Sequence, residues 1–368
     1  MSGALAETFA EHQYCGIPIR NIWLLMLYAS DLFAEVEKRQ NRVERERVAE
    51  NIPDIIAEVL VYFVRERLLR GLTRASLPKQ ADLTRVRGRI DTLRTARYML
   101  LERGRVACRY HEPTLNTPRN RLIKTALERG GHIVARPDLK EKCRDFATLM
   151  FRLGVKDALP TREELSQEVY GVNDVYDRHA VAAAHLLLDM FIPATFAGAE
   201  SLISPQEKDR WLRRLFEKSV RGFYRVTAGE HWDVHPGNKR QDWPILEPSE
   251  DVSRLLPQME LDIVLTNAER ERKIVIDTKY TQMITQGFHR ENTLETRHMY
   301  QMYAYLLSQN ESRMDRTARG ILLYPAVDDS ADVAFEMQGH HILFATVNLN
   351  ADAKSIRREL LALVDIAE

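Results

Sequence analysis

The stretch that decides the fold of the C-terminal half is QMELDIVLTNAERERKIVIDTKY, residues 258–280. Two apolar runs, QMELDIVLT and RKIVIDTKY, flank the polar segment NAERE, which is the pattern of a β-hairpin. Side chains alternate along a strand, so Asp277 and Lys279 point to the same face of the sheet. A carboxylate and an ammonium at the end of a buried run are costly unless they pair or hold an ion. The hairpin therefore predicts a site built around Asp262, Asp277 and Lys279.

These residue types suit phosphodiester hydrolysis assisted by a divalent cation. Asp262 and Asp277 can hold Mg²⁺ against a phosphate oxygen, and the Thr278 carbonyl can add a further oxygen ligand. Lys279 can orient the attacking water or stabilise the developing charge. Glu217, on the helix before the hairpin, is an additional candidate acid. The alternative is an ordinary Asp277–Lys279 ion pair and a solvated or i,i+4-paired Glu217, because short acidic motifs occur by chance.

The elements around the hairpin indicate an α/β domain. An amphipathic helix at 208–226 precedes it, and a helix at 296–309, strands at 319–325 and 340–349, and a final helix beginning near Ala351 follow it. On the helix at 296–309, Gln301 and Tyr305 lie one turn apart and could reach the site. The alternative interpretation is a surface glutamine and a core tyrosine.

The N-terminal half is predicted to be a separate α+β domain. We expect a flexible leader at 1–16, the first domain at 17–195 and the second at 196–368, with the boundary in the run FIPATFAGAESLISPQEKD. Apolar periodicity predicts buried helices after Pro18 and over 51–72. Further helices are expected at 120–134, near 139–153 and at 178–191.

An arginine-rich region, 85–109, interrupts the helices of this half. RVRGRID (85–91) and RVACRYHEP (105–113) are predicted to be short strands around a helix. Strand alternation would place Arg85, Arg87 and Arg89 on one face, which suits binding of phosphate or of an acidic partner. A solvated charged surface is the alternative.

Composition restricts the function further. Lys+Arg and Asp+Glu both number 53 in 368 residues, so DNA binding by bulk charge is not expected, and local patches or a partner must supply it. The three cysteines are far apart, which disfavours a disulfide framework or zinc site. We see no signal peptide and no membrane-spanning apolar run, so we expect a cytoplasmic protein. The sequence has no G-x-x-x-x-G-K-[ST] phosphate loop and so is not an NTPase of that class.

Several segments, taken in order, form a recognisable set: IPIRNIWLLMLYAS (17–30), GRID (88–91), NTPRNRLIKTAL (116–127), LLPQMELDIVL and IVIDTKY (within 255–280), GILLYP (320–325) and FATVNL (344–349). Together they resemble one family, McrC, the nuclease subunit of the McrBC modified-cytosine restriction system. The resemblance runs from about residue 17 to residue 365. It implies a PD-(D/E)XK restriction-endonuclease-like α/β domain at the C-terminus.

The resemblance also implies residue roles and a cofactor. Asp262, Asp277 and Lys279 match the catalytic residues of the family, with Mg²⁺ as the metal. Leu261 stands where the motif name has proline. Glu217 stands where the superfamily often has a helix acid.

The partners implied are a ring of a McrB-like AAA+ GTPase and double-stranded DNA carrying methylcytosine. The N-terminal domain would dock on the ring and stimulate GTP hydrolysis, GTP being bound by the partner and not by this chain. Arg20, Asn21, Arg87 and Arg89 are candidate contacts to the partner or to DNA. Two copies of the nuclease domain are expected to meet for double-strand cleavage.

Two other functions fit the same residues. One is an autonomous PD-(D/E)XK DNA nuclease in defence or repair, active with Mg²⁺ alone. The other is a non-catalytic adaptor that only activates the partner GTPase.

Overall fold

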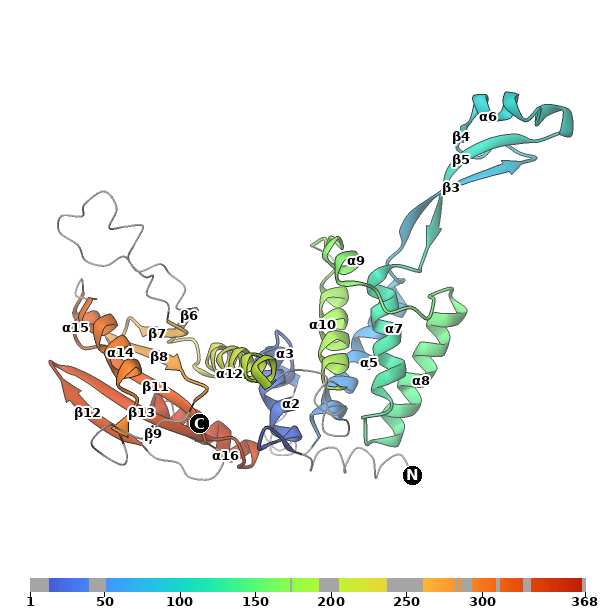
Figure 1. Ribbon diagram of the computed structural model, residues 1–368. Helices are drawn as coiled ribbons and strands as arrows, with labels where there is room; N and C mark the ends of the chain where they lie inside the picture. Colours follow the sequence, from blue (N-terminus) through green and yellow to red (C-terminus); the bar gives the residue numbers. More distant parts are fainter. Residues whose placement is uncertain are drawn as a thin grey trace, which may run out of the picture. The chain divides into compact units, whose positions relative to one another are not determined.

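The computed structural model describes residues 13–39, 51–172, 174–191, 205–236, 261–281, 284–285, 293–308, 312–326 and 332–365. Their fold is mixed α/β, as the sequence predicts (Figure 1). The chain divides into two compact units. One consists of Gly3–Ile55 with Asp189–Glu368, and the other is Ile56–Leu188.

The first unit is built on a six-stranded sheet of order β12-β13-β11-β8-β7-β6. Its strands are β6 (Asp233–Pro236), β7 (Ile263–Asn267), β8 (Arg272–Thr278), β11 (Arg319–Ala326), β12 (Val333–Met337) and β13 (His340–Asn348). β7 and β8 are antiparallel, with Ile263 opposite Ile276, whereas β8, β11 and β13 run parallel. The predicted hairpin is confirmed, and it lies in the interior of the sheet.

The two edge strands are not anticipated by the sequence. The region from His231 onward is expected to be a loop, yet Asp233–Pro236 forms β6 along β7; residues 237–260 lie outside the described ones. β12 alternates exposed and half-buried side chains. Edge strands bury little apolar surface, so their hydrophobic pattern is weak.

Helices cover this sheet. They are α12 (Pro205–Thr227), α14 (Thr296–Ser308), α15 (Arg313–Arg316) and α16 (Ala353–Leu363); two short strands, β9 (Ile284–Thr285) and β10 (Thr293–Leu294), pair with each other. Met302, Tyr305 and Leu306 of α14 pack in one cluster with Val275 of β8 and Leu322 of β11. This packing places α14 over the sheet face to which the side chains of Val275 and Asp277 both point.

The N-terminal segment belongs to the same unit as this sheet. It contains β1 (Gln13–Tyr14), β2 (Ile17–Pro18), α2 (Ile19–Tyr28) and α3 (Phe33–Arg39). The side chain of Asn21 donates hydrogen bonds to the carbonyls of Leu349 (2.7 Å) and Ala351 (2.9 Å), just after β13. α2 and α3 therefore group with 189–368, whereas the sequence-based division places them with the helices of 56–188. Apolar periodicity shows that α2 is buried but not against which part of the chain.

Close backbone packing joins α2 to α12. A Cβ at Gly222 would lie 1.9 Å from the carbonyl oxygen of Tyr28, so only glycine fits at this crossing. The rings of Tyr28, Phe33 and Phe223 surround it, with centroids 4.7–6.4 Å apart. The hydroxyl of Tyr224 then donates to the Leu360 carbonyl of α16 at 2.7 Å.

The end of the predicted leader is ordered. Gln13–Tyr14 pairs with Ile17–Pro18 through a two-residue turn at Cys15 and Gly16, whose φ angles are 52° and 80°. Two successive positive φ angles match the twist of a tight hairpin. Residues 13–16 are thus part of the fold, while residues 1–12 lie outside the described ones.

The second unit combines helices with a small sheet. Its elements are α5 (Ile52–Arg70), β3 (Ala75–Leu83), β4 (Arg89–Ile90), α6 (Thr92–Arg97), η1 (Leu101–Arg103), β5 (Val106–Thr114), α7 (Pro118–Gly130), α8 (Pro137–Arg152), α9 (Arg162–Ser166) and α10 (Val175–Asp189). The predicted helices are confirmed. Their start signals are visible locally: Thr117 caps α7, accepting from the Asn120 amide, and Pro118 occupies its first turn.

The sheet of the second unit corrects one prediction. Its order is β3-β5-β4, and β3 pairs with β5 over nine residues. Of the strand predicted over 85–91, only Arg89–Ile90 forms, so Arg85 and Arg87 do not share a strand face with Arg89. Gly88 has a φ of 70°, and a Cβ there would lie 2.5 Å from the Arg109 carbonyl oxygen, which explains the turn.

A buried polar network ties the helices to the base of this sheet. Arg67 of α5 pairs with Asp177 of α10 and donates to Asn120 of α7 at 2.7 Å. Asn120 donates in turn to the carbonyls of Thr73 (3.0 Å), just before β3, and Leu115 (2.8 Å), just after β5. Buried polar groups paired in this way fix one arrangement of the elements, although Nη1 of Arg67 has no hydrogen-bond partner among the described residues.

Among the residues described, no helix combines the length and apolarity needed to cross a bilayer.

Candidate active site

The two predicted carboxylates lie together at one end of the β7–β8 pair. Asp262 immediately precedes β7 and Asp277 is the penultimate residue of β8, beyond the Ile263–Ile276 pair. One oxygen of Asp262, Oδ2, accepts hydrogen bonds from the amide of Thr278 (2.7 Å) and from its hydroxyl. These bonds fix the direction of the Asp262 carboxylate. The role of the Thr278 side chain is not anticipated by the sequence, which offers only its carbonyl.

Lys279 completes the group. Its ammonium lies 2.7 Å from Oδ2 of Asp277 and donates to the side-chain oxygen of Gln301 at 3.0 Å. Its backbone amide donates to the Leu323 carbonyl of β11 at 2.8 Å, so the strand continues to support it past the end of β8. The prediction that Gln301 can reach this site is confirmed, whereas Tyr305 packs in the apolar cluster under α14.

Burial destabilises the charged form of Asp277. Its side chain is only 4% exposed, and burial raises its pKa to about 6. The Lys279 ammonium opposes this shift, and the negative charges of Asp262 and Glu217 add to it. A buried carboxylate with a raised pKa beside a lysine is characteristic of functional sites.

Glu217 lies close enough to influence this group. It is half-buried on α12, and its carboxylate lies 3.6 Å from the Arg221 guanidinium one turn later. The i,i+4 pairing expected as the alternative is thus present. Its charge also acts on Asp277, so the two interpretations are compatible.

Two further residues extend the site and are not predicted from the sequence. Nδ1 of His298 lies 3.0 Å from the hydroxyl of Tyr324. Burial and the nearby positive charge of Lys279 lower the pKa of His298. Burial raises the pKa of Tyr324, and the negative charge of Asp277 adds to this shift. The available signal was the three-residue spacing of His298 and Gln301 on one helix, which places both on one face.

The oxygen ligands available for a metal are few. In the part of the chain that the structure describes, no cluster of three or more His, Cys, Asp or Glu side chains could hold a metal ion. Asp262 and Asp277 therefore form a two-carboxylate site, which would need backbone or substrate oxygens to complete a hard-cation shell. The buried charge of Asp277, now balanced by Lys279, fits a bound cation.

The candidate partner residues have different environments. Arg20 is exposed on α2. Asn21 is 2% exposed and its amide is used within the chain, so the structure does not support it as a partner contact. The Arg87 guanidinium stacks over the Tyr110 ring at 4.3 Å and lies 3.7 Å from Glu112, while Arg89 is exposed opposite Arg109.

Comparison with known proteins places this chain in a family. The model of the McrBC 5-methylcytosine restriction system component matches residues 5–325. The chain belongs to this family. The resemblance seen in the sequence is thereby confirmed.

The chain is also similar to individual proteins. A type IV methyl-directed restriction enzyme, EcoKMcrBC of Escherichia coli K12, is 26% identical over 357 residues, covering 95% of this chain and 97% of the relative. A half-complex of Thermococcus gammatolerans McrB AAA+ hexamers with bound McrC is similar with a TM-score of 0.46 and 15% identity, covering 94% of this chain and 76% of that chain. The McrBC complex of the same organism gives a TM-score of 0.33 and 14% identity over 52% of this chain and 61% of that one.

Proposed function

We propose that this chain is the Mg²⁺-dependent endonuclease subunit of a restriction complex that cleaves methylcytosine-containing DNA, with a PD-(D/E)XK-type site. The observation that carries the proposal is the juxtaposition of Asp262, Asp277 and Lys279 at the end of two adjacent strands. Membership of the McrBC family supports the restriction role.

Each side chain has a defined part in the proposed reaction. Asp262, oriented by Thr278, and Asp277, held in a dehydrated position, would hold the Mg²⁺ ion together with the Thr278 carbonyl. The bound ion would polarise the phosphate and lower the pKa of water. Lys279 is fixed by Gln301 and can stabilise negative charge on the phosphate. Glu217 acts on Asp277 through its charge. We therefore assign it a supporting role and not that of a required metal ligand.

We further propose that the N-terminal half docks on a McrB-like AAA+ GTPase ring, which binds GTP and delivers the DNA. The segment 86–101 of the second unit, which contains β4, α6 and the start of η1, supports this, because it exposes several large apolar side chains among its arginines. They are Val86, Ile90, Leu93, Tyr98, Met99 and Leu101, with 40–83% exposure. Exposed apolar groups gathered in this way mark interaction surfaces. Arg87 and Arg89 lie on the same small sheet and turn.

The test combines the chain with its ring GTPase, methylated DNA, Mg²⁺ and GTP. We expect Asp277→Asn and Lys279→Ala each to reduce cleavage by about 10²-fold or more while stimulation of GTP hydrolysis is kept. Lys273→Ala is the matched control, since Lys273 pairs with Asp315 (2.6 Å) at the opposite end of the same strand. It should retain cleavage.

Other outcomes would identify another function. Cleavage by the chain with Mg²⁺ alone, independent of partner and GTP, would indicate an autonomous nuclease. GTPase stimulation with no cleavage by the wild-type protein under any condition would indicate the non-catalytic adaptor. Either result would overturn the proposal as stated.

A further inference from the structure

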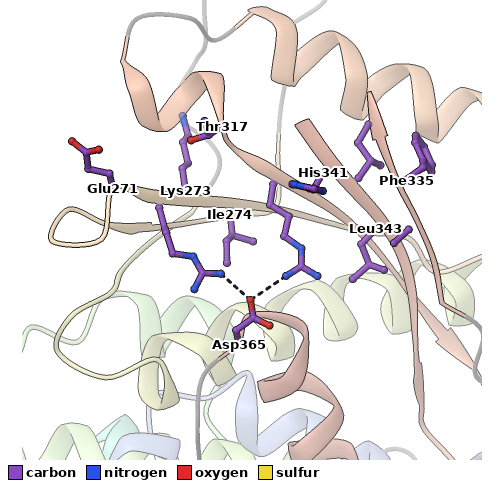
Figure 2. A pocket seen from close by; sticks show the side chains of 12 residues that line it. Glu271, Lys273, Ile274, Thr317, Phe335, His341, Leu343 and Asp365 are labelled. Carbon is purple, nitrogen blue, oxygen red and sulfur yellow. Dashed lines mark hydrogen bonds and ion pairs between the residues drawn. The ribbon is translucent and has the colours of Figure 1, made fainter. Parts of the chain in front are cut away.

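A second site of interest is a cavity of about 370 Å³ at the start of β8 and β11 (Figure 2). It lies away from the candidate active site, because Arg272 at its rim begins β8 and Asp277 stands near the end of that strand. Five residues of strand separate them, roughly 17 Å. Nothing in the proposed nuclease reaction uses this cavity.

Two arginines converge on a single oxygen in this cavity. Arg272 of β8 lies 2.8 Å and Arg319 of β11 lies 3.4 Å from Oδ2 of Asp365, as the dashed lines in Figure 2 show. Both arginines are the first residues of neighbouring parallel strands, so the sheet fixes their spacing. Each guanidinium has several N–H donors, and one carboxylate oxygen uses few of them. An anion with more oxygens could engage more of these donors.

Asp365 is poorly suited to hold these arginines permanently. Its side chain is 59% exposed, and its φ of 53° is in the left-handed region, which is unfavourable for a non-glycine residue. It follows the end of α16, outside the sheet, and its contacts with the sheet are the two ion pairs with Arg272 and Arg319. An exposed ion pair of this kind contributes little to stability. A competing anion could therefore displace Asp365 at low cost.

The other charged side chains and the apolar side chains that line the cavity indicate which ligand it could bind. Lys273 is already paired with Asp315, and His341 lies 4.0 Å from Glu336. The second acid of the lining, Glu271, pairs with Arg313 at 3.2 Å. Arg272 and Arg319 are therefore the lining cations that share one acid. Side chains of Ile274 and Leu343 line the cavity on the sheet (Figure 2). A cavity of this size, with a partly apolar lining and a few convergent charges, has the properties of a small-molecule site.

We propose that this cavity binds the phosphate of a nucleotide, with Arg272 and Arg319 as its ligands and Asp365 as the internal carboxylate that it displaces. The nucleotide can be free or part of a DNA strand, since the phosphate chemistry is the same. This site is independent of the proposed nuclease function.

The test is calorimetric titration of the full chain, carrying Asp277→Asn to prevent DNA cleavage, with thymidine 5′-monophosphate. Thymidine should bind at least about tenfold more weakly, and Arg272→Gln or Arg319→Gln should weaken binding of the monophosphate by about the same factor. Asp365→Asn should tighten it severalfold, because the competing carboxylate is removed. A short oligothymidylate without terminal phosphates distinguishes the source: its binding at this site would show recognition of the DNA backbone, and its failure to bind would show recognition of a terminal or free phosphate.

Arg313→Gln is the matched control. Arg313 pairs with Glu271 near the same cavity, at 3.2 Å, but does not contact Asp365. Its removal should leave binding unchanged. Two results would overturn the proposal: thymidine 5′-monophosphate does not bind, or Asp365→Asn weakens its binding while lowering Tm. Either result would mean that the two arginines only hold Asp365, and with it the segment after α16, against the sheet.

Discussion

Replacing Asp277 with asparagine should stabilise the metal-free protein at neutral pH. Folding raises the pKa of this carboxyl from its ordinary value of 3.8 to about 6, mainly through burial. Between these two values the native state binds more protons than the unfolded state, so stability falls as pH rises through this window. Above pH 6 the cost of the buried charge approaches roughly 3 kcal/mol.

Most of this cost develops between about pH 4.5 and pH 7.5, where it amounts to roughly 2 kcal/mol. Asparagine carries no charge at either pH and escapes it. For a folded unit of this size, the difference corresponds to about 4–8 °C in Tm. The side chain is 4% exposed, so solvent screening does not reduce the effect appreciably.

The assay is thermal denaturation in chelator-containing buffer at the two pH values. The Tm of the wild type should fall relative to that of Asp277→Asn as pH rises, and Mg²⁺ at pH 7.5 should raise the Tm of the wild type alone. Asp315→Asn serves as control: pairing with Lys273 lowers the pKa of Asp315 below its ordinary value of 3.8, so its contribution to stability is constant across the two pH values and the Tm difference between this variant and the wild type should not change. If the wild type and Asp277→Asn keep a constant Tm difference across this range, Asp277 is not a desolvated carboxylate. The argument that burial destabilises its charged form is then refuted.

Three further outcomes follow from particular contacts. Asn21→Ala should cost about 1–3 kcal/mol in chemical denaturation, because a buried and a part-buried carbonyl lose their donor; a cost near zero would contradict its anchoring role. Gly222→Ala should cost at least about 1–3 kcal/mol, since its Cβ would overlap the Tyr28 carbonyl, and a normal melting curve would refute the close helix crossing. Arg87→Glu should lower stimulation of the partner's GTPase severalfold without changing Tm by more than a few degrees; unchanged stimulation would remove this residue from the proposed docking surface.

Local patterns predicted the hairpin and its acidic end correctly. IVIDTKY reads as a buried strand that ends in Asp-Thr-Lys, and the alternation of side chains is enough to place Asp277 and Lys279 on one face. The helices were also predictable, because their apolar periodicity and capping residues are local signals.

Other features depend on contacts between distant residues. The bond from Thr278 to Asp262 joins residues 16 positions apart, and the His298–Tyr324 pair joins residues 26 apart. The arginines at 85 and 87 lie in a turn set by the approach of Gly88 to the neighbouring strand. None of these contacts leaves a periodic signal in the sequence.

The sequence by itself determined the main helices, the central hairpin, the residue types of the candidate site and the family, because each is encoded in short stretches of chain. Only the tertiary structure decided that α2 and α3 pack with the C-terminal sheet, that Asn21 is an internal anchor, and that Asp277 is buried enough to shift its pKa. The physical reason is the same in each case: burial, dehydration and hydrogen-bond partners depend on which surfaces meet, and residues hundreds of positions apart supply those surfaces.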